Sequence, residues 1–236
     1  MKKTVVYAAT RNIYPNVVPC VRSLAANGNV DEAVILIEDD EFPYELPEIC
    51  RTINVAGQSY FRKDGKNARK RWTCMVLMKV ALSQIFPELN RVLYLDCDTI
   101  VEHDLGDLWE MDLTGYFYAA VRQPNDGRGG RFLEYIDKAG ADYFNAGVLL
   151  CNLSMLRELR MDHLLIKALN MIDYEFCEQD CITDLCHGKI LALPGRYNVS
   201  RFTVPDEEGE IYIRHFAADA GWMTNEWGRR WSMEED

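Results

Sequence analysis

The stretch Arg91-Val92-Leu93-Tyr94-Leu95-Asp96-Cys97-Asp98 joins an apolar run to two aspartates. Its first five residues are typical of a strand buried in a sheet, and the aspartates follow the end of that strand. Side chains two positions apart on an extended chain share a face, so the carboxylates of Asp96 and Asp98 converge. Two like charges this close raise each other's pKa unless a cation lies between them. A divalent ion meets that need, and Mn²⁺ also accepts an imidazole, although aspartates at a strand end commonly cap turns.

Strand-like and helix-like segments alternate on both sides of this stretch. Strands are expected at residues 4–10, 33–38, 52–56, 91–95, 116–121, 146–151, 190–193 and 211–214. Helices are expected at residues 16–26 and 71–86, and from an N-cap at Ser154 to about Tyr174. This order predicts an α/β fold, with a mostly parallel twisted sheet and helices on both faces. Ligands of such sheets bind beyond the carboxyl ends of the strands, where the two aspartates stand.

The composition indicates an ordinary globular protein. No linker, repeat or low-complexity run divides the 236 residues, so we expect one domain over residues 1–236. With 26 basic and 37 acidic residues the net charge is −11, which argues against a nucleic-acid-binding protein. A small anionic ligand remains compatible with that charge, because one metal ion can reverse the field inside a cleft. Neither GxGxxG nor GxxxxGK[ST] occurs, which argues against dinucleotide oxidoreductases and P-loop enzymes.

The cysteines and the apolar segments bear on the compartment. The apolar run near the N-terminus is too short for a signal peptide, and we expect no transmembrane segment. The eight cysteines contain no CxxC pair. Cys177, Cys181, Cys186 and His187 cluster without the spacing of a common zinc motif, so buried free thiols are the preferred interpretation. These features predict a cytoplasmic protein.

The aspartate pair also suits a phosphohydrolase. Haloacid-dehalogenase phosphatases carry DxDx[TV] after an apolar strand and use the first aspartate as a nucleophile. Here Ile100 stands at the fifth position, and Thr99 comes one place early. Their motif also normally lies on the first strand, whereas this pair follows three expected strands. The phosphohydrolase remains the alternative enzyme class.

Four segments together resemble glycosyltransferase family 8, the family of glycogenin and of bacterial galactosyl- and glucosyltransferases. They are residues 7–12 (YAATRN), 93–98 (LYLDCD), 144–150 (FNAGVLL) and 178–180 (EQD), in the order of the family. A fifth, degraded segment joins His215 to Trp222. The resemblance implies a GT-A fold, a UDP-sugar donor, Mn²⁺ with Mg²⁺ as a substitute, and retention of anomeric configuration. The acceptor is then a carbohydrate or another hydroxyl compound.

The resemblance assigns the metal site and part of the donor site. It implies that Asp96 and Asp98 bind the metal, that Asp96 also faces the donor, and that His215 completes the metal shell. The first-strand turn, with Ala8, Thr10 and Asn12, matches the family's uracil- and ribose-binding turn, although the family's aspartate is missing there. Lys79 stands where the family tends to have an arginine that contacts the donor. A lysine keeps the charge but loses the bidentate fork, and it fits a solvated helix equally well.

The remaining donor and catalytic residues follow from the third and fourth segments. Asn145 is expected to contact the donor sugar, and Ala146 and Gly147 to leave room for its ring. A glycine in a buried strand also points to a close approach. Gln179 is a poor nucleophile, so we assign it to stabilising positive charge at the anomeric centre. Asp180 is the candidate for orienting the sugar or attacking it, and a helix N-cap is the alternative for residues 178–180.

The fifth segment departs from its family pattern, His-x-Gly-x-x-Lys-Pro-Trp. Trp222 keeps a donor-site position, but Ala217 and Ala220 replace the glycine and lysine that hold the diphosphate. A non-catalytic UDP-sugar-binding protein is therefore the second hypothesis. Residues 62–71 (RKDGKNARKR) and 123–131 are expected to be solvated loops, or alternatively loops that grip an acceptor or close over the donor.

Overall fold

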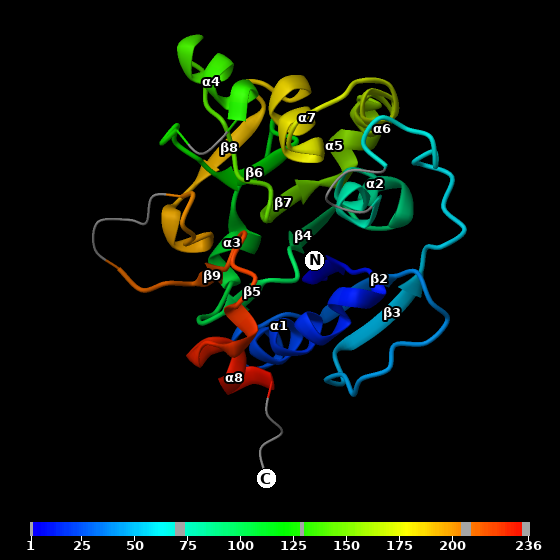
Figure 1. Cartoon of the computed structure of the whole chain (residues 1–236), viewed down its shortest axis with the longest axis vertical. Helices are drawn as coiled ribbons and strands as arrows, with labels where there is room; N and C mark the ends of the chain where they lie inside the picture. Colours follow the sequence, from blue (N-terminus) through cyan, green and yellow to red (C-terminus); the bar gives the residue numbers. More distant parts are fainter. Residues whose placement is uncertain (1, 69–73, 128–129, 204–208, 233–236) are drawn as a thin grey trace.

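A single large sheet forms the centre of the molecule (Figure 1). The computed structural model describes residues 2–68, 74–127, 130–203 and 209–232. Within these ranges the strand order is β3 (Cys50–Asn54), β2 (Glu32–Ile37), β1 (Thr4–Ala8), β4 (Arg91–Leu95), β7 (Val148–Asn152), β6 (Tyr118–Val121) and β8 (Ile190–Leu193). Strand β7 runs antiparallel to both of its neighbours, and the other neighbouring pairs are parallel. The expected mostly parallel sheet is confirmed.

The central strands are buried on both faces, which explains their continuous apolar runs. Successive side chains of β4 point to opposite sides. Val92 and Tyr94 pack into one core, and Leu93 and Leu95 pack into the other. The sheet therefore separates two apolar cores. A strand that alternated apolar and polar residues would place its polar side chains in one of these cores.

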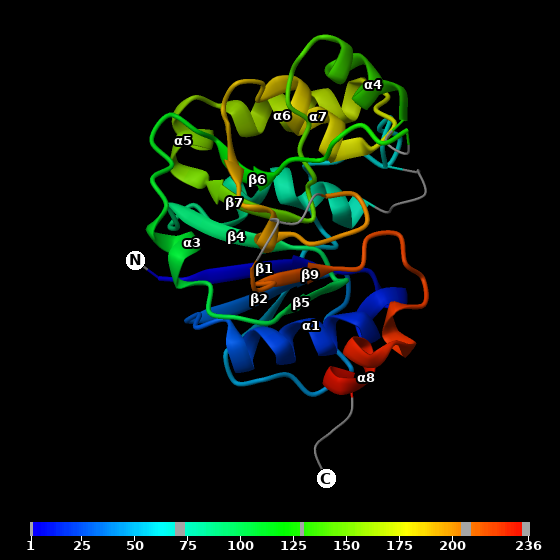
Figure 2. The same cartoon turned by 90° about the vertical axis from the view of Figure 1, so that its left-hand side faces the viewer.

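Helices cover both faces of the sheet, as expected (Figure 2). One face carries α1 (Tyr14–Asn27), α3 (Gly106–Glu110) and α8 (Glu226–Ser232). The other carries the 3₁₀ segment η2 (Cys74–Val80), α2 (Leu82–Ile85), α5 (Leu153–Glu158), α6 (Met161–Met171) and α7 (Cys177–Leu185). Helix α4 (Gly130–Lys138) and the short segments η1 (Arg11–Ile13), η3 (Gly195–Tyr197) and η4 (Trp222–Thr224) complete the described elements.

A second, two-stranded sheet lies beside the first. It pairs β5 (Thr99–Val101) antiparallel with β9 (Ile213–His215). Strand β5 is held against α1, because the Ser23 hydroxyl accepts from Val101 N at 3.1 Å and Asn27 Nδ2 donates to Val101 O at 2.8 Å. Since β5 begins directly after Asp98, this small sheet carries a late part of the chain to the carboxyl end of β4.

The helix expected at residues 71–86 is tighter than predicted. Residues 71–73 lie outside the described ranges, and Cys74–Val80 forms 3₁₀ turns before α2 begins. Side chains three positions apart eclipse each other in a 3₁₀ helix. Val76 and Lys79 therefore share a face, and that face looks toward the two aspartates.

The helix expected from Ser154 to Tyr174 is two helices. Asn152, not Ser154, is the N-cap of α5, because its side chain accepts from Met155 N. The chain then breaks at Arg160, which adopts a left-handed φ of 55°. Asp162, buried in the first turn of α6, accepts from Ser83 Oγ at 2.7 Å. This contact fixes α6 on the segment before β4, and a continuous helix would carry Asp162 away from it.

The cysteines are free thiols, as predicted. Cys177, Cys181 and Cys186 are buried in the core on the α7 side, and burial raises the pKa of each of the last two thiols. None of the helices in the described ranges is long and apolar enough to cross a membrane.

Candidate metal and donor site

The two aspartates follow β4 as predicted, and backbone contacts fix both of them. Asp96 N donates to Gly147 O at 2.8 Å, which ties the end of β4 to the residue before β7. Thr99 Oγ1 donates to Asp96 O at 2.8 Å and closes a tight turn. The hydroxyl of Thr99, and not an aspartate side chain, closes this turn, so the structure does not support the turn-capping alternative for the two aspartates.

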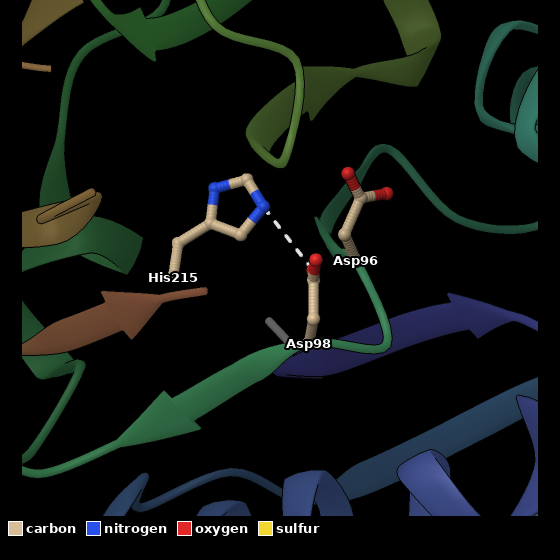
Figure 3. Close-up of side chains that lie close together, drawn as sticks. All are labelled: Asp96, Asp98 and His215. Carbon is tan, nitrogen blue, oxygen red and sulfur yellow. Dashed lines mark ion pairs between the residues drawn. The ribbon is translucent and has the colours of Figure 1, made fainter. Parts of the chain in front are cut away.

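His215 reaches the aspartates through the small sheet. It is the last residue of β9, not the residue after it, and it pairs with Thr99. Phe216 N donates to Asp98 O at 2.9 Å, which locks the two strand ends together. Consequently, His215 Nε2 lies 3.1 Å from Asp98 Oδ1, and both side chains point into the same space (Figure 3). The ligand atoms of Asp96, Asp98 and His215 lie within 4.8 Å of one another.

The three side chains suit a hard divalent cation. Two carboxylates and one imidazole are ligands that Mn²⁺ accepts. Asp98 Oδ1 is buried and, within the described residues, has no hydrogen-bond partner, although His215 Nε2 lies at ion-pair distance. Burial raises the pKa of Asp98, but the His215 ring outweighs it and holds that pKa below its usual value. A buried carboxylate oxygen without a hydrogen bond is what a bound cation would satisfy.

Lys79 is buried, so the solvated-helix alternative is wrong. Its side chain is 1% exposed. Lys79 Nζ lies 3.0 Å from each of three oxygens, namely Asp96 Oδ1, Glu178 Oε1 and the carbonyl of Ala146. Burial lowers the pKa of Lys79, but the two carboxylates raise it by more. Lys79 therefore neutralises charge behind Asp96, and it is not among the described residues that line the cavity.

Glu178 is a site residue to which the sequence pattern gave no separate role. It is the second residue of α7, is 8% exposed, and lines the same cavity as the aspartates. Burial raises the pKa of Glu178, and the Lys79 ammonium offsets part of that effect. Its place in the EQD segment, directly before Gln179, could have identified Glu178 as a site residue from the sequence.

Asn145 and Gln179 lie on the cavity wall, joined through Gln123. Gln123 Oε1 accepts from Asn145 Nδ2 at 3.1 Å and from Gln179 Nε2 at 3.3 Å. Gln179 Oε1 accepts from Ala146 N at 2.9 Å, which leaves that oxygen one lone pair free. Gln123 lies two residues after β6, and the rule that ligands bind beyond strand ends would have found it.

Gly147 lies against His215. A Cβ on Gly147 would fall 2.1 Å from His215 Cε1 and 2.7 Å from Nδ1. The predicted close approach is therefore present, but the group that approaches is the imidazole of the candidate metal ligand. Ala146 lines the cavity beside it.

Asp180 lies beneath the cavity and is fully buried, outside the described lining. Its Oδ1 accepts from Tyr143 OH at 2.6 Å, and its Oδ2 accepts from Phe176 N at 2.9 Å. Tyr143 OH in turn accepts from Gln179 Nε2 at 2.9 Å. These contacts favour an orienting role, through Tyr143, over nucleophilic attack. The N-cap alternative is wrong, because Phe176 is the N-cap of α7 and residues 178–180 lie inside the helix; Asp180 instead accepts from the backbone N–H of that N-cap residue.

The cavity itself has a volume of about 390 Å³. Its polar wall carries the two aspartates, His215, the amides and Glu178, while Val76, Phe176 and Phe202 supply apolar surface. A few convergent polar groups in a partly apolar hollow are typical of a small-molecule site.

The first-strand turn lies next to the aspartates but outside the described lining of this cavity. Ala8 ends β1, and its carbonyl accepts from Cys97 Sγ at 3.4 Å. Thr10 and Asn12 hydrogen-bond each other, and Asn12 is exposed. Asp39, from the loop after β2, accepts from Tyr14 OH at 2.8 Å. It puts a carboxylate near the turn that lacks the family's aspartate.

Trp222 does not line the cavity within the described residues. It is 2% exposed, packs in the core on the α1 side, and stacks on Phe216 with ring centroids 5.2 Å apart. Ala217 and Ala218 line the cavity in its place, where they contribute no charge. Arg69, Lys70 and Arg71 of the basic run, and Arg128 and Gly129 of the second loop, lie outside the described residues.

The arrangement defines a GT-A glycosyltransferase fold. The galactosyltransferase LgtC, solved with donor and acceptor sugar analogs, superposes with a TM-score of 0.68 at 20% identity, over 92% of this chain and 88% of its own. The glycosyltransferase GlyE of Streptococcus pneumoniae TIGR4 superposes with a TM-score of 0.71 at 20% identity, over 100% of this chain and 61% of its own.

The sequence places the chain within that class. The family model of glycosyl transferase family 8 matches residues 5–220, so the chain belongs to this family. This membership argues against the phosphohydrolase alternative.

Curated relatives are similar over about half of this chain. A putative glycosyltransferase of Haemophilus influenzae is 29% identical over 55% of it, and glycosyltransferase GlyA of Streptococcus pneumoniae is 41% identical over 48%. The lipopolysaccharide 1,2-glucosyltransferase of Escherichia coli is 29% identical over 50%. The matches span only 39%, 15% and 36% of these relatives' own lengths.

Proposed function

We propose that this chain is a retaining glycosyltransferase that moves a hexose from UDP-glucose or UDP-galactose to a hydroxyl group of a glycan or another acceptor. The observation that carries the proposal is the meeting of Asp96, Asp98 and His215 at one wall of the cavity. These residues come from distant parts of a family 8 chain. Mn²⁺ is the proposed cofactor, with Mg²⁺ as a substitute.

Asp96, Asp98 and His215 would hold the divalent ion, which would supply Lewis-acid stabilisation of the charge on the leaving diphosphate. Side chains of the protein are proposed to supply charge compensation and stabilisation of the anomeric carbon. Lys79 compensates the charge of Asp96 and Glu178 from inside the protein, so three acidic side chains can share the site. The remaining lone pair of Gln179 Oε1 is proposed to stabilise positive charge at the anomeric carbon.

The residues expected to contact the donor remain proposals, and the roles of Gly147, Lys79 and Trp222 differ from those expected from the sequence. Asn145 and Ala146 line the cavity and are proposed to contact the sugar. Gly147 gives room to His215, and Lys79 acts through Asp96. Ala8, Thr10 and Asn12 are proposed to hold the nucleoside, and Trp222 to support the loop through Phe216.

A non-catalytic UDP-sugar-binding protein is the second candidate, and one observation favours it. The described lining of the cavity contains no lysine or arginine to offset the leaving group. The two candidates predict the same binding but different turnover.

The test is a UDP-release assay with Mn²⁺ and a panel of nucleotide sugars, run beside calorimetry with UDP. An active transferase is expected to release UDP slowly even without acceptor. Asp98→Ala is expected to abolish Mn²⁺-dependent UDP binding, and His215→Ala to weaken it less, because water can replace one of several ligands. Asp112→Asn, at an exposed carboxylate, is the matched control and is expected to behave as wild type.

Each result separates the candidates. UDP binding without release or transfer favours the non-catalytic protein. Hydrolysis or binding of GDP- or dTDP-sugars, with none of UDP-sugars, refutes the donor assignment. Unchanged Mn²⁺-dependent UDP affinity in Asp98→Ala refutes the metal site.

A further inference from the structure

A line of buried amides runs from His215 away from the aspartates. Asn198 follows η3 and is fully buried. Its Oδ1 lies 2.9 Å from His215 Nδ1, and its Nδ2 donates to Asn145 Oδ1 at 2.8 Å. Asn198 does not line the described cavity, so its side chain acts on the site through other residues.

A backbone group fixes the direction of every hydrogen bond in this line. Gly147 N donates to Asn145 at 3.0 Å, and since a backbone N–H can only donate, the receiving atom must be Oδ1. Asn198 must then offer its NH₂ group to that oxygen, because two amide oxygens can only accept and would repel each other at this distance. The rotation of the Asn198 amide is thereby set, and its own Oδ1 faces the histidine.

The far end of the network is anchored in the same way. Ala146 N donates to Gln179 Oε1, so the Gln179 NH₂ group faces Gln123 Oε1. Gln123 accordingly accepts from Asn145 Nδ2, in agreement with the direction set by Gly147 N. Two backbone N–H groups therefore hold the whole line in one orientation.

We propose that Asn198 is a positioning residue that keeps a hydrogen on His215 Nδ1 and leaves the Nε2 lone pair for a divalent cation. An oxygen beside Nδ1 can only accept, so the neutral ring must carry its hydrogen there. His215 Nε2 is the nitrogen that faces Asp98. The inference rests on the metal site proposed above, and it adds a residue that no motif of the sequence singled out.

The experiment measures Mn²⁺ binding to the nucleotide-free protein by calorimetry, together with the electron spin echo signature of a coordinated imidazole nitrogen. Asn198→Leu removes the acceptor and is expected to weaken Mn²⁺ binding by about 10- to 100-fold, with loss of the nitrogen signal. Asn198→Asp also breaks the bond to Asn145 but keeps an acceptor at Nδ1. It is expected to bind Mn²⁺ at least as tightly as wild type.

Thr203→Val is the matched control for damage to the loop. Thr203 is buried and donates its hydroxyl hydrogen to Asn198 O, and the other hydrogen-bond partner of that hydroxyl is Ser200, not His215. This variant is expected to keep both the affinity and the nitrogen signal.

Asn198→Leu with wild-type affinity would refute the positioning role while leaving the metal site intact. Equal losses in Asn198→Leu, Asn198→Asp and Thr203→Val would also refute it, since packing would then explain the effect. A wild-type chain that binds no Mn²⁺, or a His215→Ala variant that binds it unchanged, would refute the metal site itself.

Discussion

At the scale of single residues, a glycine decides how the candidate metal ligand lies. The imidazole of His215 occupies the space that any side chain at position 147 would need. The strand after Gly147 is fixed between two neighbours and cannot move away. The ring must therefore yield if a Cβ is added.

Gly147→Ala is accordingly expected to displace His215 and to lower Mn²⁺ affinity at least tenfold, at a cost of about 1–3 kcal/mol in the free energy of unfolding. Calorimetry and urea unfolding measure the two effects. Gly57→Ala is the control, because a Cβ there meets nothing within 4 Å. Wild-type Mn²⁺ affinity in Gly147→Ala would contradict the described contact.

Residues of the site differ in how far the sequence could predict them. Asp96 and Asp98 follow from a local pattern, since an apolar strand and a two-residue spacing put both carboxylates at one sheet edge. His215 required the family resemblance, because its position depends on pairing between β5 and β9. Nothing local to Lys79 or Asn198 indicates that either is buried, since burial arises from α7, β7 and β9 packing around them.

At the scale of elements, Lys79 joins three parts of the fold. It comes from η2, and its partners lie at the end of β4, before β7 and on α7. Removing its charge leaves the nearly buried carboxylate of Glu178 and the partly exposed carboxylate of Asp96 without their cation, which costs more than losing an exposed pair.

Lys79→Met is therefore expected to lower the free energy of unfolding by about 3–5 kcal/mol in metal-free buffer. Adding Glu178→Gln should restore part of the loss, because one stranded charge disappears. Urea unfolding of the two single variants and the double variant measures the coupling. Lys167→Met, at an exposed lysine of α6, is expected to change stability by less than about 0.5 kcal/mol. A Lys79→Met protein as stable as wild type would contradict the role given to this ion pair.

The pattern of apolar residues predicts some boundaries of the helices and strands but not others. Strand β4 was predicted to the residue, since its apolar run ends at a charge. The break at Arg160 was missed, because both helices share one apolar pattern and the left-handed residue is fixed by contacts of Asp162 with Ser83. The reversed direction of β7 was also not predicted, since an antiparallel strand buried on both faces has the same composition as a parallel one.

At the scale of the whole molecule, hydrogen-bonded carboxylates tie stability to pH. Burial raises the pKa of Glu32, but hydrogen bonds from Lys2 and Arg51 lower it by more, and the Arg11 contact lowers the pKa of Asp39. A carboxylate with a lowered folded-state pKa contributes stability above its unfolded pKa, about 4, and loses it as the pH falls. Glu178 and Asp180, whose pKa values are raised, act in the opposite direction.

The Glu32→Gln variant isolates the pH-dependent contribution of Glu32 to the free energy of unfolding. It is expected to cost about 0.5–1 kcal/mol at neutral pH, and the difference from wild type should vanish as the pH falls through the folded-state pKa of Glu32. Urea unfolding across an acidic pH series measures it. A difference that grows on acidification would contradict the lowered pKa.

The pairing of β5 with β9 has a consequence for the order in which the chain is made. Asp96 and Asp98 leave the ribosome long before His215, while Lys79 is already present to offset the charge of Asp96. The imidazole arrives only when β9 pairs with β5, after all seven strands of the large sheet have been synthesised. The three candidate metal ligands are thus together only at the end of assembly, and the large sheet has to form before then on its apolar strands alone.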